Sequence, residues 1–380
     1  MRVEGTAKIA DFLGDSIVYR RLEPADRRLP GLTFLAGELG LAPNIPPRKS
    51  DRDYARVIVS ILRAAQASRQ AAGPLRQLIY IGDSPTLDLQ AFANLRAVSG
   101  WDSWAFIGKD DMSQESRLSN DGAVYYSTRW ANLPDFLELV RTKGVNPDIS
   151  CAVVVDLDKT LLGPRGRNDR VIDAARAEAA VQVADRVLVG EHSRAKFAEI
   201  YREMNQPKYH FFTEDNQDYL VYCALMLAAG VYGFDELQEA LSNHTVSSFG
   251  EFLSLMEREM ADTASRDLQR IHHEVMGNFR LSDPTPFKSF RRQEYLTTTG
   301  RMSPNQDGWS LEKILEEHIT INYELVQALD YLKRAGALLL GLSDKPDEAV
   351  FPTPALQAEG HRPLHHVTAF LVGERLAWPM

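Results

Sequence analysis

Three short, continuous apolar runs stand out along the chain, each bounded by turn-forming residues and flanked by helical patterns. They cover residues 78–81, 151–155 and 338–342. Runs of four or five apolar residues are typical of parallel strands that are buried on both faces. Polar residues follow each run directly, and in open parallel sheets ligands bind at the carboxyl ends of the strands. The pattern therefore predicts an α/β protein with a binding site at this edge of its sheet.

Helical periodicity fills much of the chain between these runs. Residues 52–71 carry apolar side chains at steps of three and four, and Gly73 and Pro74 end the pattern. The first 50 residues are rich in proline and read as irregular, although the pattern allows a strand around Leu32–Leu35. Further predicted elements are helices over 86–96, after Pro134 and over 319–336, and strands over 101–108 and within the C-terminal LHHVTAFLVGE.

The middle of the chain has a different pattern, which is almost wholly helical from residue 164 to residue 320. The stretch 219–230 is apolar all round, so it predicts a buried helix that ends at Gly230. We therefore expect a helical domain inserted into an α/β core. The predicted division is 1–163 for the first part of the core, 164–320 for the helical domain and 321–380 for the second part of the core.

Composition narrows the class of protein further. The chain has 380 residues, enough for two domains, and its 44% hydrophobic and 25% charged residues are ordinary for a globular protein. No apolar run approaches the roughly 20 residues that span a bilayer, so we expect no membrane partner. Only two cysteines, Cys151 and Cys223, occur, which indicates a cytoplasmic protein without a disulfide framework. A net charge of −9 argues against nucleic acid as a partner.

Carboxylates gather where the predicted strands end. Asp156 and Asp158 follow the 151–155 run, and Asp83 follows the 78–81 run with Asp88 five residues later. An EF-hand calcium loop does not explain the first pair, because Leu161 stands where that loop requires glycine. The chain has no GxxxxGK[ST] or GxGxxG motif, so ATP or dinucleotide binding has no support.

These segments resemble the motifs of the haloacid dehalogenase-like (HAD) superfamily, whose members are chiefly magnesium-dependent phosphatases. VVVDLDKT at 153–160 resembles the first motif, LLGLSDK with Ser343 the second, and IGDSPTLD at 81–88 the fourth. Lys49, which precedes a long helix, matches the lone lysine of the third motif, with Lys345 as the alternative. The family order is rotated here to third, fourth, first and second, so the chain resembles a circularly permuted HAD protein.

The resemblance implies a doubly wound, Rossmann-like, mostly parallel core sheet with a helical cap, and it assigns roles to individual residues. Asp156 would be the nucleophile that forms an aspartyl-phosphate, and Asp158 would be the general acid and base. Lys49 and Ser343 would stabilise charge on the phosphoryl group.

The resemblance also implies a magnesium ion. Its ligands would be a carboxylate oxygen of Asp156, the main-chain carbonyl of Asp158 and a carboxylate oxygen of Asp83, with Asp88 as a further ligand or an outer-shell holder. Such a cation would offset the repulsion between these carboxylates and a phosphate dianion.

The resulting functional hypothesis is Mg²⁺-dependent hydrolysis of a small phosphorylated metabolite. A phosphomutase or phosphonatase would use the same Asp156, and a non-catalytic module that binds a phosphorylated ligand is the alternative from another class. Basic residues in the helical segment and its borders either bind substrate or form a solvated face: Arg165, Arg167, Lys288, Arg291 and Arg292.

A histidine cluster near the C-terminus is the last chemically suggestive group. It comprises His361, His365 and His366. Pro363 forbids a helix that would align the first two, and no cysteine lies nearby. We therefore expect no metal site there.

Overall fold

A seven-stranded, mostly parallel sheet forms the centre of the fold. The computed structural model describes residues 1–69, 73–188, 190–260, 265–302 and 308–378. The strand order is β2-β9-β7-β3-β4-β6-β5, and every neighbouring pair is parallel except β5 with β6. The predicted α/β class is therefore confirmed. The strands are β2 (Ile17–Val18), β3 (Gln77–Gly82), β4 (Asp102–Gly108), β5 (Leu118–Asp121), β6 (Val124–Ser127), β7 (Cys151–Asp156) and β9 (Leu338–Leu342).

Strand β7 lies in the middle of the sheet, between β3 and β9. All six of its residues are buried, as a central parallel strand requires. Val153 pairs with Ile79 on one side and with Leu339 on the other. The three apolar runs of the sequence are thus adjacent strands, and their carboxyl ends lie at one edge of the sheet.

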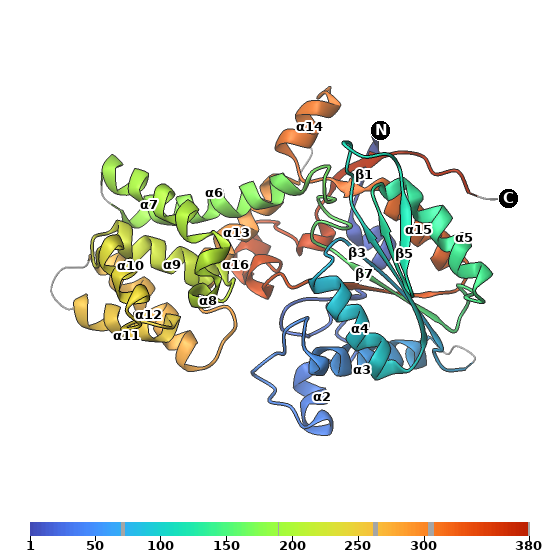
Figure 1. Cartoon of the computed structure of the whole chain (residues 1–380), viewed down its shortest axis with the longest axis horizontal. Helices are drawn as coiled ribbons and strands as arrows, with labels where there is room; N and C mark the ends of the chain where they lie inside the picture. The colour runs from blue at the N-terminus through green and yellow to red at the C-terminus, as the bar shows by residue number, and fades with distance from the viewer. Residues whose placement is uncertain (70–72, 189, 261–264, 303–307, 379–380) are drawn as a thin grey trace. The chain divides into compact units, whose positions relative to one another are not determined.

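Helices cover both faces of this sheet (Figure 1). On one face, α3 (Arg52–Ser68) and α4 (Leu87–Ser99) pack with inward side chains such as Tyr80 and Val154. On the other face, Phe136 of α5 (Leu133–Thr142) contacts Phe106, with ring centroids 5.4 Å apart. The neighbouring helix α15 (Tyr323–Arg334) packs beside α5 and on β9. The remaining helices of this part are α1 (Ile9–Leu13), α2 (Leu32–Leu39), α14 (Leu311–Glu317) and α16 (Pro354–Ala358).

One prediction about the chain ends is confirmed and one is wrong. The predicted C-terminal strand is β10 (Ala369–Gly373), which belongs to a separate three-stranded sheet with β1 (Arg2–Ala7) and β8 (Ile321–Asn322). Residues 32–35 lie in the helix α2 and not in a strand. Leu32, Leu35 and Ala36 of this helix are buried, so the helical three-and-four spacing of the apolar side chains prevails.

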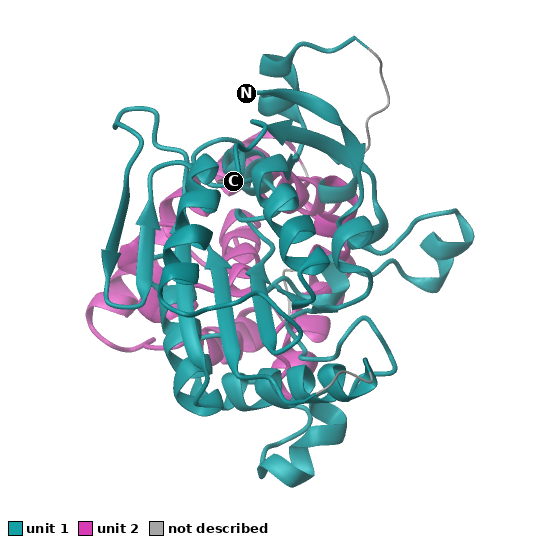
Figure 2. Ribbon diagram, turned by 90° about the vertical axis from the view of Figure 1, so that its right-hand side faces the viewer, with its two compact units in different colours: residues 1–174, 298–380 teal, residues 175–297 magenta. Residues whose placement is uncertain are grey.

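Residues 175–297 form a second compact unit that is entirely helical where the structure describes it (Figure 2). We call it unit 2, and residues 1–174 and 298–380 unit 1. The expected apolar helix is α9 (Gln217–Ala228), in which every residue from Asp218 onward is buried. The other α-helices wholly within unit 2 are α7 (Glu191–Met204), α8 (His210–Thr213), α10 (Phe234–Ser242), α11 (Phe249–Glu259) and α12 (Arg266–Arg280).

Unit 2 is shorter than the helical domain predicted at 164–320. Residues 164–174 and 298–320 belong with the sheet in unit 1. Asn168 shows why: its side-chain amide donates to the carbonyls of Leu315 and His318, and its amide oxygen accepts from the Thr320 N–H. These hydrogen bonds connect the segment that follows β7 to the segment that precedes β8. Helices α6 (Asp169–Val187) and α13 (Lys288–Gly300) run across the division.

Two further features follow the sequence. Cys151 and Cys223 are both buried and free. Among the described residues, no helix has both the length and the apolar character needed to cross a bilayer.

Candidate active site

Polar residues from adjacent strands meet at the carboxyl edge of the sheet. Asp83 follows β3, Asp156 is the last residue of β7, and Ser343 follows β9. Because these strands are parallel neighbours, their ends bring together segments far apart in the sequence. The predicted site residues are distributed over this edge in two groups, one around Asp156 and one around Ser343.

The first group is a cluster of three buried carboxylates from Asp83, Asp88 and Asp156. One oxygen from each lies within 4.8 Å of the other two. No more than 5% of any of these residues is exposed, so their mutual repulsion is poorly screened. A donor set made only of carboxylate oxygens matches the preference of hard cations such as Mg²⁺. The cluster could therefore hold a metal ion.

Lys49 lies directly against this cluster. Its ammonium Nζ is 2.6 Å from Asp88 Oδ1 and 2.6 Å from Asp156 Oδ1, and its side chain is buried. Burial opposes the charged form of this lysine, but Asp156 and Asp88 raise its pKa well above the usual value. The alternative lysine, Lys345, is placed elsewhere: its Nζ lies 3.8 Å from Asp158 Oδ1.

Asp88 is held by four hydrogen bonds, two to each oxygen. Lys49 and the Tyr80 hydroxyl donate to Oδ1, and the N–H groups of Asp83 and Ser84 donate to Oδ2. Burial alone would raise the pKa of Asp88, but Lys49 and these donors lower it. Because both of its oxygens are already occupied, Asp88 is better suited to fixing the loop after β3 than to binding a metal ion directly.

Gly82 makes this close packing of Asp88 possible. A Cβ at position 82 would lie 2.5 Å from both Cγ and Oδ2 of Asp88. Any larger residue would push the carboxylate out of its hydrogen bonds with the loop. The glycine of the GD pair is thus required by the approach of Asp88 and not by an unusual backbone angle.

Asp83 has two partners of its own, one of which the sequence did not indicate. The Thr160 hydroxyl donates to its Oδ1 at 3.2 Å, and the Arg165 guanidinium Nε donates to its Oδ2. Burial and Asp88 raise the pKa of Asp83, although Arg165 acts in the opposite direction. Arg165 lies in the GPRG loop, which the sequence analysis placed in the helical domain. Its contact partner is 82 positions away, so spacing carried no signal for it.

Asp156 is the most strongly perturbed carboxyl group of the cluster. Burial raises its pKa well above the usual range, and the nearby Asp88 and Asp83 add to this effect while Lys49 opposes it. Three carboxylates thus share two cationic side chains, Lys49 and Arg165, which leaves a deficit of one positive charge. A proton or a metal ion would supply that charge.

Asp158 and Ser343 form the second group on the same edge. The Ser343 hydroxyl donates to Asp158 Oδ2 at 2.6 Å, and the N–H of Lys345 donates to the same hydroxyl oxygen. The Asp158 side chain is 26% exposed, whereas that of Asp156 is 7% exposed. Two aspartates separated by one residue therefore have different surroundings, one enclosed and one open to solvent.

The basic residues named in the sequence are placed differently: Arg292 is exposed and Lys288 pairs with Asp283, whereas the side chains of two others are buried. Arg167 is buried in unit 1, where it pairs with Asp110 and Glu324. Arg291 is buried in unit 2, where it pairs with Asp218 and Glu294. Both guanidinium groups are thus structural cross-links, and substrate binding by them is not indicated.

A cavity of about 550 Å³ opens beside Asp83 within unit 1. Residues that line it include Asp83, Ser84, Lys109, Arg117, Tyr126 and Arg165. Lys109, Arg117 and Arg165 are basic and others carry hydroxyl groups, so the cavity could bind the polar groups of a ligand.

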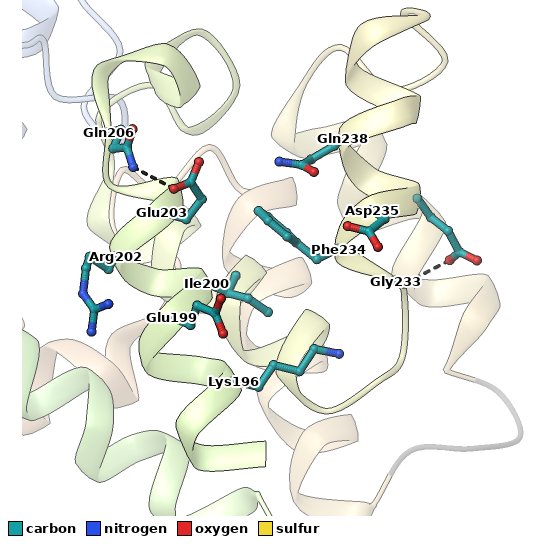
Figure 3. Close-up of a pocket in the computed structure, with 11 residues that line it drawn as sticks. Lys196, Glu199, Ile200, Arg202, Glu203, Gln206, Gly233, Phe234, Asp235 and Gln238 are labelled. Atoms are coloured by element: carbon teal, nitrogen blue, oxygen red, sulfur yellow. Dashed lines mark hydrogen bonds between the residues drawn. The ribbon is translucent and has the colours of Figure 1, made fainter. Parts of the chain in front are cut away.

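A larger cavity of about 730 Å³ lies within unit 2, between α7 and α10 (Figure 3). Both acidic and basic side chains line it, among them Lys196, Glu199, Glu203 and Asp235. Neither of the two groups of potential metal ligands found among the described residues belongs to it. We therefore place the candidate active site at the sheet edge of unit 1.

Comparisons with known proteins give no further guidance. No family model, curated protein or solved structure matches the chain.

Proposed function

We propose that this protein is a Mg²⁺-dependent phosphatase of the HAD type, circularly permuted, with residues of the helical unit acting as a cap. Its substrate would be a small phosphate monoester. The observation that carries the proposal is the enclosure of Asp156, Asp83 and Asp88 around the Lys49 ammonium at the carboxyl edge of a parallel sheet. Three separate chain segments supply these groups, and they correspond to three of the four motifs that the sequence resembles.

Asp156 is the best candidate for the nucleophile. Its hydrogen bond from Lys49 goes to Oδ1, so Oδ2 would be the attacking atom. In the first step, this oxygen bonds to phosphorus while the bond from phosphorus to the leaving oxygen breaks. The product is an aspartyl-phosphate, and covalent catalysis of this kind divides one difficult displacement into two easier ones.

We assign the two proton transfers of the reaction to Asp158. It would protonate the leaving oxygen in the first step and then take a proton from the water that hydrolyses the aspartyl-phosphate, releasing inorganic phosphate. Its partial exposure supports this assignment. A carboxyl group that exchanges protons with solvent has to be more open than the nucleophile.

The cation would be held by carboxylate oxygens of Asp83 and Asp156, with the main-chain carbonyl of Asp158 as the third protein ligand. When bound, Mg²⁺ would neutralise charge between these carboxylates and the phosphoryl group. Lys49 would supply positive charge from the protein itself, and Ser343 a hydrogen bond to a phosphoryl oxygen. The polar cavity beside Asp83 would then take the leaving group.

Hydrolysis of p-nitrophenyl phosphate with Mg²⁺ tests this proposal directly. Asp156→Asn should retain less than ~1% of wild-type turnover, because an amide cannot form the covalent intermediate. Asp121→Asn, at the exposed last position of β5, is the matched control and should keep full activity. Wild-type binding of phosphate esters without turnover would instead identify a non-catalytic binding module. A panel of phosphorylated metabolites would then define the substrate.

A further inference from the structure

A second cluster of metal-ligand residues lies in unit 1, apart from the residues of the proposed active site. Asp15 follows α1, and His365 and His366 close the short 3₁₀ turn η4 (Leu364–His366). One ligand atom from each residue lies within 4.8 Å of the other two. We propose that these three residues form a site for a divalent transition metal of the Zn²⁺ type. The expectation that the histidines bind no metal considered only nearby residues, and Asp15 lies 350 positions from His365.

The ligand atoms already converge. Asp15 Oδ1 lies 2.9 Å from His366 Nε2 and 3.2 Å from His365 Nε2. Ligands around tetrahedral zinc lie ~2.0–2.1 Å from the ion, which places them about 3.3 Å from one another. The observed spacings are close to this value, so an ion could enter with small side-chain movements.

Tyr19 completes the surroundings of His365. Its buried hydroxyl lies 3.1 Å from His365 Nδ1, on the side of the ring away from Asp15. Metal-bound histidines nearly always donate their second ring N–H to such a partner, which fixes the tautomer and the ring orientation.

The backbone holds the ligands in place before any ion arrives. The Asp15 carbonyl accepts hydrogen bonds from the N–H groups of Ile17 and Asp26, at 2.7 and 2.9 Å. The His366 N–H donates to the Pro363 carbonyl at 2.8 Å. Pre-organisation of this kind lowers the cost of binding. The side chains of Asp15 and His366 are 51% and 41% exposed, so an ion can reach them from solvent.

The donor chemistry distinguishes this site from the carboxylate cluster. Two imidazole nitrogens and one carboxylate suit Zn²⁺, Co²⁺ or Ni²⁺, whereas Mg²⁺ prefers oxygen ligands. Three protein ligands leave a coordination position for water. A bound ion would link the segment after α1 to the segment before β10, so it would cross-link the two ends of the chain. Without an ion, the cluster would be held together only by the hydrogen bonds between Asp15 and the two histidine rings.

Co²⁺ binding to metal-free full-length protein tests the site, with saturating Mg²⁺ present to occupy the carboxylate cluster. The wild type should bind one Co²⁺ with the visible absorption of nitrogen ligation, and Zn²⁺ should displace it. His366→Ala should lose this absorption and weaken Co²⁺ binding by at least ~10-fold, because it removes a ligand. Tyr19→Phe should weaken binding by ~10–100-fold, since the ring of His365 is then less well oriented.

His361→Ala is the matched control, because it removes a histidine of the same segment that is outside the cluster. It should bind Co²⁺ as the wild type does. The proposal is wrong if His366→Ala, shown to be folded by circular dichroism, binds Co²⁺ with wild-type affinity and absorption. It is also wrong if His361→Ala or Asp83→Asn abolishes the absorption instead. Phosphate hydrolysis plays no part in these measurements, so their outcome is independent of the proposed function.

Discussion

Replacing Lys49 with methionine tests the electrostatics of the candidate site more sharply than any other single change. Methionine keeps an unbranched, flexible side chain but has no charge. The Lys49 ammonium contacts Asp88 and Asp156 at 2.6 Å each, and the three side chains are 5%, 2% and 7% exposed. Removing one partner of a buried ion pair typically costs about 3–5 kcal/mol, because the remaining charge is left uncompensated. We expect a loss of this size in metal-free protein near pH 8.

The loss should depend on pH in a direction that the structure fixes. In the variant, Asp156 can become neutral by taking up a proton, and its pKa is already raised by burial. A carboxyl group with a raised pKa in the folded state stabilises the fold at low pH, and this contribution is lost as pH rises through the folded pKa. Each unit of pKa shift corresponds to about 1.4 kcal/mol. The variant should therefore approach wild-type stability near pH 5.

Urea unfolding followed by tryptophan fluorescence measures this stability in the relevant part of the protein. All five tryptophans belong to unit 1, so the signal reports the sheet and its site and not the helical unit. They are Trp101, Trp104, Trp130, Trp309 and Trp378. Samples with EDTA and with Mg²⁺ should be compared. Mg²⁺ should stabilise Lys49→Met more than the wild type, because it supplies the missing positive charge.

Lys345→Met is the matched control, since Lys345 is also buried and its Nζ lies 3.8 Å from the carboxylate of Asp158, which is not one of the three in the cluster. It should show no comparable pH dependence and no extra stabilisation by Mg²⁺. Our account of the cluster fails if the two variants behave alike. It also fails if Lys49→Met unfolds in EDTA at the wild-type urea concentration at pH 8.

Three further predictions concern other side chains of unit 1. Gly82→Ala should weaken Mg²⁺ binding and destabilise unit 1 by about 1–3 kcal/mol, because its Cβ would lie 2.5 Å from the Asp88 carboxyl carbon; a wild-type urea midpoint would contradict this. Arg165→Met should tighten Mg²⁺ binding measured by calorimetry, because Arg165 pairs with Asp83; unchanged or weaker binding would show that the two cations do not compete. Burial raises the pKa of Asp347 to about 6, so the wild type should lose stability relative to Asp347→Asn as pH rises from about 4 to 6. We expect a relative loss on the order of 1–2 kcal/mol, since Asp347 is partly exposed; parallel pH profiles of the two proteins would exclude this carboxyl group as the source.

Strands that are buried on both faces could be predicted from the sequence, whereas partly exposed strands could not. Strands β3, β7 and β9 are covered on both faces, so their apolar runs are unbroken and easily recognised. Strand β1 has the sequence RVEGTA and is largely exposed, so no apolar run marks it. Its partner β10 lies at the other end of the chain, and a pairing over that distance leaves no trace in local periodicity.

The same distinction holds for the candidate site. Asp83 and Asp156 could be predicted as neighbours because each directly follows a buried strand, and parallel strands bring their ends together. Lys49 was proposed only through a resemblance to a family motif, and no local pattern required its contact with Asp88. Arg165 was predicted to belong to the helical domain, whereas it lies in unit 1. It is a loop residue, and the order of the strands does not determine which residues a loop contacts.

The cluster around Asp15 was not predicted for two reasons: its residues carry no local sequence signal, and they are far apart along the chain. Asp15 precedes β2, a strand of two residues that is too short to give an alternating or continuous apolar signal. The histidines lie in a short 3₁₀ turn, where helical ligand spacing does not apply. Spacing rules for metal sites presuppose that the ligands share one local element, so they reject a site whose third ligand comes from the opposite end of the chain. Candidate sites of this kind become visible only when the topology is known; here α1, which precedes Asp15, packs against the η4 turn that carries the histidines.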